Sequence, residues 1–152
     1  MTSSEIDDEA LVRAFPGEPI THDNAAHYRG RLRHELVISK CQDCDEWHHP
    51  PKPVCPQCWS TRVVPTSVSG SGTIFMVIFL NQGPPADGVD YSTPYPVASI
   101  DLADAPGVRF TSTVVGGTND EVVIGAAVEL DWIERNGSPM PVFRLTRSEA
   151  AK

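Results

Sequence analysis

The chain has few of the features that would place it in a membrane or outside the cell. No stretch approaches the ~20 apolar residues that a helix needs to cross a bilayer, so no membrane span is expected. Residues 1–9 are acidic and polar, unlike a secretory signal or a transit peptide. Cysteine is confined to four closely spaced positions. These absences predict a reducing, cytoplasmic setting.

Recognisable catalytic motifs are also missing. There is no G-x-S-x-G nucleophile elbow and no P-loop. The glycine-containing run Ser69–Gly72 precedes an expected strand, so no helix N-terminus follows it to hold a phosphate. The carboxylates are spread over turns and outward strand positions. No independent catalytic site is visible, and the sequence predicts that this chain is not an enzyme on its own.

Charge is unevenly distributed along the 152 residues, whose net charge is −8. Residues 1–20 and 66–152 are both acidic. Residues 21–65 hold five acidic and six basic residues together with all five histidines. This middle segment is therefore the part of the chain best suited to an anion. The acidic total, with a pI of about 4.9, argues against nucleic acid as a partner.

The four cysteines follow the pattern C-x2-C-x10-C-x2-C, at Cys41, Cys44, Cys55 and Cys58. Two such pairs suit tetrahedral Zn²⁺. Two disulfides would fit a smaller secreted domain better, and a redox pair would need no duplicate. With four thiolates no coordination position stays open, so the metal is expected to be structural. His48 and His49 are expected to line the surface nearby.

The chain divides into four predicted segments: a helical segment at 1–36, a zinc ribbon at 37–65, a barrel at 66–147 and a tail at 148–152. In the first segment, apolar spacing predicts a helix from Ile6 to Ala14. A second helix is expected to begin near Thr21, which is a good N-cap residue.

The third segment reads as β-structure. Apolar residues alternate with polar ones at Ala98, Ile100 and Leu102 and again in later strands, and Asn136-Gly137 predicts a hairpin turn. The unbroken apolar run Ile74–Leu80 predicts a strand buried on both faces or curving round a barrel. Five strands at this spacing suit a small closed barrel of the OB type, with a small open sandwich as the alternative.

Several ordered motifs carry a resemblance to a known family. They are the ribbon residues Cys41–Cys44, Trp47 and Pro50–Cys58, and downstream Ser69–Ile74, Pro96–Ala98, Ile124–Val128 and Met140–Arg144. Together they resemble the acyl-CoA-associated zinc-ribbon/OB-fold family, also called domain-of-unknown-function-35. One departure concerns the position after each second cysteine, which is commonly glycine. Asp45 and Trp59 stand there, and Trp59 should fit a positive φ poorly.

The resemblance implies a mainly β fold with N-terminal helices, a rubredoxin-like zinc ribbon and a five-stranded OB-fold barrel. It also implies a partner, a thiolase-like subunit of the lipid-transfer type or a related aldolase that shortens steroid side chains. The partner would carry the catalytic groups, and the small subunit would help to bind or enclose the acyl-CoA. A two-plus-two heterotetramer is expected, because thiolases pair through a two-fold axis.

Coenzyme A combines a phosphorylated adenosine, which needs cations, with a pantetheine arm, which needs an apolar tunnel. We expect Lys52 and Arg62 to contact phosphate, and Trp47 to pack against an apolar portion or the partner. Each of them could instead be a solvated or ribbon-packing residue.

Two other functions stay open at this stage. The chain could be a free-standing acyl-CoA binding or carrier module that works without a partner. It could also bind single-stranded nucleic acid, as OB barrels and ribbons do elsewhere, although its acidic barrel argues against this.

Overall fold

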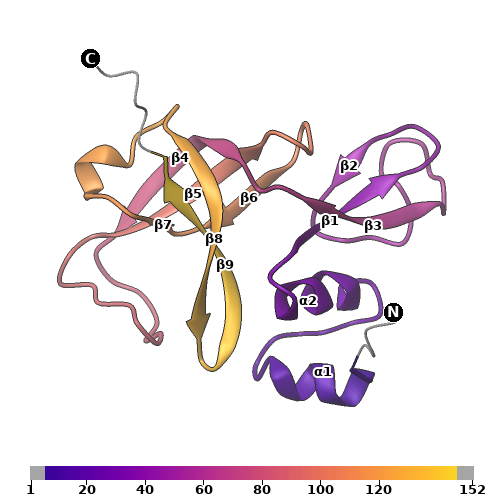
Figure 1. Ribbon diagram of the computed structural model, residues 1–152, viewed down its shortest axis with the longest axis horizontal. Coiled ribbons are helices and arrows are strands. Elements are labelled where there is room, and N and C mark those ends of the chain that lie inside the picture. The colour runs from indigo at the N-terminus through magenta and orange to yellow at the C-terminus, as the bar shows by residue number, and fades with distance from the viewer. Residues whose placement is uncertain (1–5, 147–152) are drawn as a thin grey trace. The chain divides into compact units, whose positions relative to one another are not determined.

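The computed structural model describes residues 6–146 (Figure 1). By its internal contacts the chain forms two compact units. Among the described residues, the first unit contains residues 6–68 together with Glu134–Met140, and the second contains Ser69–Ile133 together with residues 141–146. The predicted tail at 148–152 lies outside the described residues. In the described range no helix has the length and apolar character needed to cross a membrane.

Two short helices open the first unit, α1 (Asp8–Ala14) and α2 (Ala25–Leu32). Asp7 caps α1, since its carboxylate accepts a hydrogen bond from the Ala10 N–H at 2.8 Å. The regular turns of the second helix begin at Ala25, four residues after Thr21, near which the start was expected. Thr21 still makes the reciprocal bonds of a capping box, since its Oγ1 accepts from the Asn24 N–H at 3.4 Å and its own N–H donates to Asn24 Oδ1 at 2.7 Å.

The ribbon sheet has three antiparallel strands in the order β2-β1-β3. They are β1 (Leu36–Cys41), β2 (Trp47–His48) and β3 (Val63–Val68). Helix α2 packs closely on β1 at Gly30, where an added Cβ would lie 2.5 Å from Val37 Cγ2. Only glycine allows this approach.

The tip of a long hairpin, Glu134–Met140, belongs to the same unit. Ser138 Oγ donates to the Ala14 carbonyl at 2.5 Å, and Arg31 Nε donates to the Pro139 carbonyl at 2.9 Å. The Arg31 guanidinium also stacks at 5.0 Å from the centroid of the buried Phe15 ring. These contacts tie the helices to the hairpin tip.

The second unit is built on a six-stranded sheet in the order β6-β5-β4-β8-β9-β7. Its strands are β4 (Gly72–Leu80), β5 (Tyr95–Leu102), β6 (Arg109–Ser112), β7 (Val114–Val115), β8 (Ala127–Arg135) and β9 (Ser138–Leu145), with a short 3-10 helix, η1, at Asn119–Glu121. The strands β6 and β7 are successive parts of one segment, yet they lie at opposite ends of the order. That segment therefore closes the sheet into a barrel, which confirms the OB fold over the open sandwich.

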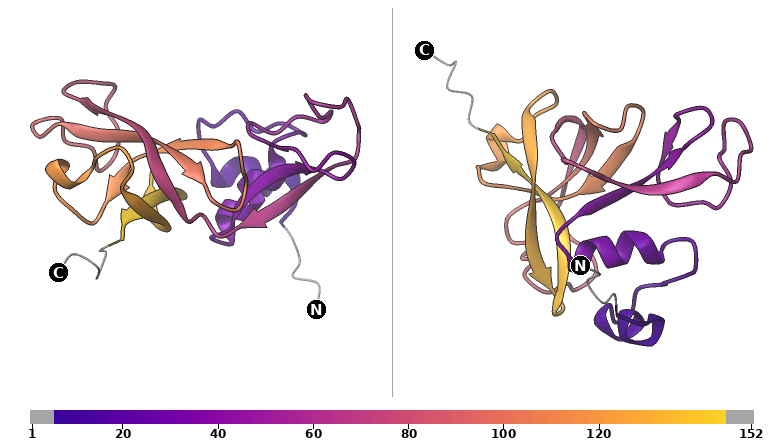
Figure 2. Two further views of the ribbon diagram at one scale, coloured as in Figure 1. Left: turned by 90° about the horizontal axis from the view of Figure 1, so that it is seen from above. Right: turned by 45° about the vertical axis from the view of Figure 1, so that its right-hand side comes forward.

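The barrel core comes from the inward positions that the alternation predicted. Ala98, Ile100 and Leu102 of β5 are all buried. The Phe110 and Phe143 rings pack edge to face, with centroids 6.1 Å apart. Asn136 and Gly137 have φ of 54° and 77°, as a two-residue type I′ turn requires. Figure 2 shows the long β8–β9 hairpin that this turn joins.

The prediction for Ile74–Leu80 was wrong in one respect, because only Ile74 of this run is buried. Phe75, Met76, Ile78 and Phe79 are 42%, 51%, 52% and 37% exposed. A β-bulge between Ile74 and Met76 shifts the register against β5, and the pairing of β4 with β8 covers only Gly72 and Thr73. Beyond the bulge the strand therefore has little of the barrel to pack against.

The ribbon histidines also differ from expectation, because they do not simply line the surface. His48 is buried, and the half-buried His49 ring lies 5.1 Å from the ring of His27 on α2. His27 Nδ1 lies 3.0 Å from the Val37 carbonyl oxygen. Burial, together with the neighbouring imidazoles of His27 and His48, lowers the pKa of His49 to about 4. Burial also lowers the pKa of His27. Burial therefore favours the neutral form of His27 and of His49 in the folded protein.

We expect the free energy of unfolding to fall as the pH drops from about 6.5 towards 4, with zinc in excess. The unfolded chain binds a proton at His49 in this range, where the pKa of the folded protein is only about 4, so acid favours unfolding. His49→Gln should make the pH dependence shallower, as measured by urea unfolding between pH 7 and pH 5. The control His22→Gln, at an exposed histidine, should not. Equal slopes in wild type and His49→Gln would contradict this account.

Candidate metal centre

Two backbone turns of matching geometry present the four cysteines. In the first, Cys41 ends β1 and the Asp45 N–H donates to the Cys41 carbonyl at 3.1 Å. In the second, the Trp59 N–H donates to the Cys55 carbonyl at 3.0 Å. Each turn is then closed by a bond of 2.8 Å from the first cysteine's N–H, to the carbonyls of Glu46 and Ser60 respectively. The repeated C-x2-C spacing thus folds twice into the same knuckle.

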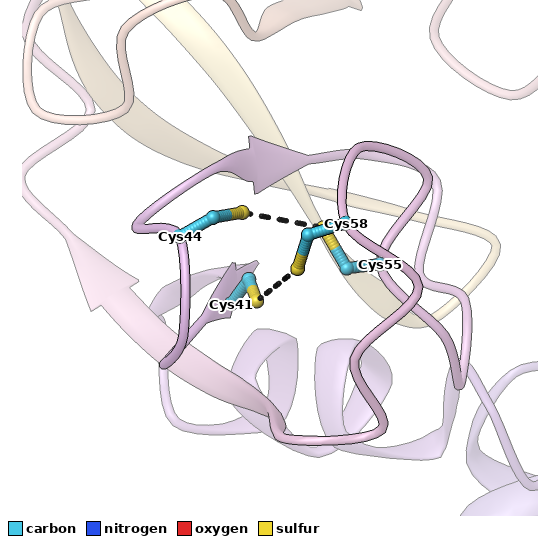
Figure 3. A group of neighbouring side chains, drawn as sticks. All are labelled: Cys41, Cys44, Cys55 and Cys58. Atoms are coloured by element: carbon cyan, nitrogen blue, oxygen red, sulfur yellow. Dashed lines mark hydrogen bonds between the residues drawn. The ribbon is translucent and has the colours of Figure 1, made fainter.

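The four sulfur atoms converge between the knuckles (Figure 3). Cys41 Sγ lies 3.6 Å from Cys58 Sγ, and Cys44 Sγ lies 3.6 Å from Cys55 Sγ. All four sulfurs lie within 4.8 Å of one another. A tetrahedral zinc with Zn–S bonds of about 2.3 Å requires S···S separations of about 3.8 Å. The arrangement therefore fits one zinc ion held by four sulfurs.

The backbone around the cluster favours thiolates. The Asp43 N–H points to Cys41 Sγ and the Gln57 N–H to Cys55 Sγ, each at 3.4 Å. Backbone N–H groups, that of Cys44 first, together with neighbouring thiols lower the pKa of the Cys41 thiol to about 7, whereas burial and neighbouring thiols raise the pKa of Cys44 to about 12 and also raise that of Cys58. Thiolate is the form that binds metal. When bound, zinc would cross-link the two knuckles; four sulfur ligands leave no coordination position for a substrate.

The residues that replace the usual glycine adopt its conformation. Asp45 and Trp59 have φ of 63° and 66°. The departure at Trp59 therefore leaves the second knuckle intact. The Trp59 side chain is 81% exposed, so it gains little packing in return for this backbone conformation.

A polar network joins the two knuckles outside the sulfur cluster. Asp43 of the first knuckle accepts hydrogen bonds from Ser60 Oγ and from the Arg62 guanidinium. The Arg62 carbonyl in turn accepts from the Gln42 N–H at 2.8 Å. Sequence reasoning missed Asp43, because the spacing between Asp43 and Arg62 matches no local pairing rule.

The three residues expected to contact acyl-CoA or the partner occupy different settings. Trp47 is half-buried in β2, with the Lys40 ammonium 5.1 Å from its ring centroid. Lys52 is exposed in the loop between the knuckles. Arg62 is 68% exposed but forms the ion pair with Asp43, so an anion would have to compete with that carboxylate. Two of the three residues, Lys52 and Arg62, are thus exposed cations.

Comparison with known proteins matches both modules. The ChsH2 rubredoxin-like zinc ribbon domain matches residues 29–64, and the ChsH2 C-terminal OB-fold domain matches residues 66–132. A DUF35 domain-containing scaffold protein of Methanothermobacter thermautotrophicus is 31% identical over 118 residues, which cover 77% of each chain. The chain belongs to the DUF35 family. Another DUF35 domain-containing scaffold protein, from Pyrococcus furiosus, is 30% identical over 68% of this chain and 71% of that protein.

A longer relative contains a region similar to this DUF35 chain. The probable enoyl-CoA hydratase alpha subunit of Thermomonospora curvata is 34% identical over 131 residues, or 85% of this chain. The chain spans only 39% of that relative's length.

Solved structures share the DUF35 fold. A chain of the Ltp2-ChsH2(DUF35) aldolase superposes with a TM-score of 0.73 at 32% identity, covering 86% of this chain and 98% of that one. A DUF35 protein of unknown function from Sulfolobus solfataricus superposes with a TM-score of 0.59 at 13% identity, covering 91% and 96%. The second likeness concerns the fold alone.

Replacing one ligand should disrupt the ribbon. We expect Cys55→Ser to lose bound zinc and to lower the melting temperature sharply, because metal binding and folding are coupled in such modules. Metal content by mass spectrometry and thermal unfolding by circular dichroism measure both effects. Gln57→Ala keeps the backbone N–H that faces Cys55 Sγ and should retain zinc. Full zinc content and unchanged melting in Cys55→Ser would refute the metal centre.

Relieving the backbone at the second knuckle should stabilise the protein. The left-handed conformation at position 59 costs a bulky residue about 1–2 kcal/mol. Trp59→Gly keeps this backbone conformation and removes that cost, but glycine adds an entropic cost of about 0.5–1 kcal/mol. We expect zinc-loaded Trp59→Gly to gain about 0.5–1 kcal/mol in urea unfolding. Asp45→Gly should gain less, because aspartate tolerates this region. Destabilisation of Trp59→Gly would show that the exposed indole packs in a way that this account omits.

Proposed function

We propose that this DUF35 chain is a non-catalytic subunit of a thiolase-fold acyl-CoA enzyme, of the thiolase or the steroid side-chain retro-aldolase type. It would assemble with that enzyme and help to bind or enclose the acyl-CoA. The observation that carries the proposal is the superposition on a chain of the Ltp2-ChsH2(DUF35) aldolase, at 32% identity over 98% of that chain.

The chemistry of the metal centre supports a role in assembly rather than catalysis. All four cysteines converge in the sulfur cluster, so the proposed zinc would leave none of them as a nucleophile. Two relatives, 31% and 30% identical to this chain, are named DUF35 domain-containing scaffold proteins. In the proposed complex the partner therefore supplies the groups that touch the reacting atoms.

Two observations favour acyl-CoA as the ligand. One relative is named a probable enoyl-CoA hydratase alpha subunit, a protein of acyl-CoA chemistry. The first unit also carries a groove of about 790 Å³ between its helices and the ribbon sheet, lined by apolar residues such as Leu11, Val12, Ile20 and Val37. Its lining also includes Arg29 and Arg33, which form ion pairs with Asp8 and Glu35. A groove of this size and mixed lining suits part of a pantetheine-bearing ligand.

The proposed assembly has two copies of each subunit, because a two-fold thiolase dimer presents two equivalent faces. We place it in the cytoplasm, where thiols stay reduced and available to zinc. The ligands of the proposed complex are a structural zinc ion and an acyl-CoA.

A pull-down from native cell extract with tagged protein, followed by mass spectrometry, tests this function. We expect a thiolase-fold protein to co-elute at near-equal amount. A lone zinc-loaded chain that binds acyl-CoA would support a free-standing carrier instead. Salt-dependent binding to oligonucleotides by a lone chain would support a nucleic-acid binder. Either of these two results contradicts the proposal.

Lys52, which is not part of the groove lining, tests a separate contact that we propose with the phosphates of acyl-CoA. We expect Lys52→Ala to weaken acyl-CoA binding to the assembled complex by about two- to fivefold, the value of one exposed charge pair. Isothermal titration calorimetry on the complex measures the change. The control Arg13→Ala removes another exposed cation, on α1, and should leave affinity unchanged. Equal affinity in Lys52→Ala and wild type would remove Lys52 from the site.

A further inference from the structure

Strand β4 and the segment after η1 expose an unusual number of large apolar side chains. We call this set the β4 surface, and it consists of Phe75, Met76, Ile78, Phe79, Val123 and Ile124. Their exposed fractions range from 37% for Phe79 to 69% for Ile124. No charged residue occurs in β4 itself.

The β4 surface is continuous across the two segments. The Gly125 N–H donates to the Ile74 carbonyl at 2.8 Å, and the Ile74 N–H donates to the Ala126 carbonyl at 3.0 Å. These bonds fasten the residues after Ile124 to β4 at the bulge. Val123 and Ile124 therefore border the point where β4 leaves the barrel wall.

Both faces of β4 are exposed beyond the bulge, which distinguishes it from the other barrel strands. Consecutive residues of a regular strand point to opposite faces, yet the neighbours Ile78 and Phe79 are both exposed; Phe75, also exposed, is the extra residue of the bulge. Within residues 6–146, the recorded pairing of β4 past Ile74 is with β5. Such a two-stranded apolar ribbon is not stable by itself in water.

A polar group borders the β4 surface at one end. The Arg109 guanidinium lies 3.5 Å from the centroid of the Phe75 ring and donates to Asp101 Oδ1 at 3.0 Å. An apolar centre bordered by an arginine and its carboxylate is the usual composition of a protein interface.

The geometry points to the β4 surface as the site where the thiolase-fold partner docks, an inference that rests on the proposed function. This chain covers 98% of the length of the related aldolase chain. Any surface by which the aldolase chain contacts a partner therefore lies on the modules that the two chains share. Elsewhere in the described residues, the exposed large apolar side chains belong to the first unit: Ile6, Val12, Val54, Trp59 and Val64. They come from separate elements, whereas the β4 surface gathers six such residues on two joined segments.

The test measures binding between the purified chain and the thiolase-fold protein that wild type captures from extract. Ile78→Asp places a charge in the centre of the proposed interface, and we expect the dissociation constant to rise about tenfold or more. Val64→Asp is the matched control, because Val64 is also an exposed strand residue, at 43% against 52% for Ile78. The control should bind within about threefold of wild type. Zinc content and melting temperature confirm that both variants fold.

Hydrogen exchange of the complex provides a second measurement that does not depend on a variant. We expect the amides of residues 75–80 and 123–124 to become protected when the partner binds. A stable wild-type complex that Ile78→Asp leaves intact, with no added protection at these amides, would overturn the β4 surface but keep the proposed function. A wild-type chain that binds no thiolase-fold protein and instead self-associates through β4 would overturn both.

Discussion

The ribbon depends on one interaction, the convergence of its four cysteine sulfur atoms on a single point. The segment from Cys41 to Cys58 is short, proline-rich and mostly exposed, and its deeply buried side chains include the cysteines Cys41 and Cys55. A segment of this size cannot enclose an apolar core large enough to order its loops. In the proposed zinc-bound state, metal–sulfur bonds replace that core, and both knuckles adopt the same backbone geometry around them.

Order in the ribbon then extends into the first unit through ordinary packing. Cys41 ends β1, and β1 carries Leu36 and Ile38, which are fully buried. Helix α2 lies against this strand at Gly30, and its His27 packs on His49 from the loop between the knuckles. The metal centre thus fixes one end of a strand whose other residues form the core of the unit. In this arrangement the role of the cysteines is structural.

The sequence predicted those parts of the structure that follow from spacing and period. The cysteine pattern predicted that the four cysteines lie together, alternation predicted the inward face of β5, and Asn136-Gly137 predicted the hairpin turn. The exposure of Ile78 and its neighbours could not be predicted, because an apolar run has the same sequence whether the barrel or another protein covers it. The pairing of Asp43 with Arg62 and the His27–His49 contact also escaped prediction, since each joins elements whose proximity only the fold determines. Thr21 and Asn24 bond to each other reciprocally, and the regular helix begins only after them, at Ala25.

The central claim is that this DUF35 chain is a zinc-bearing subunit of a larger acyl-CoA enzyme. Native mass spectrometry of the protein purified from its own cells under non-denaturing conditions tests it most directly. We predict a complex of two such chains and two thiolase-fold chains, carrying one zinc ion for each DUF35 chain. A zinc-free chain, or a zinc-loaded monomer or homo-oligomer without any thiolase-fold protein, would contradict the account.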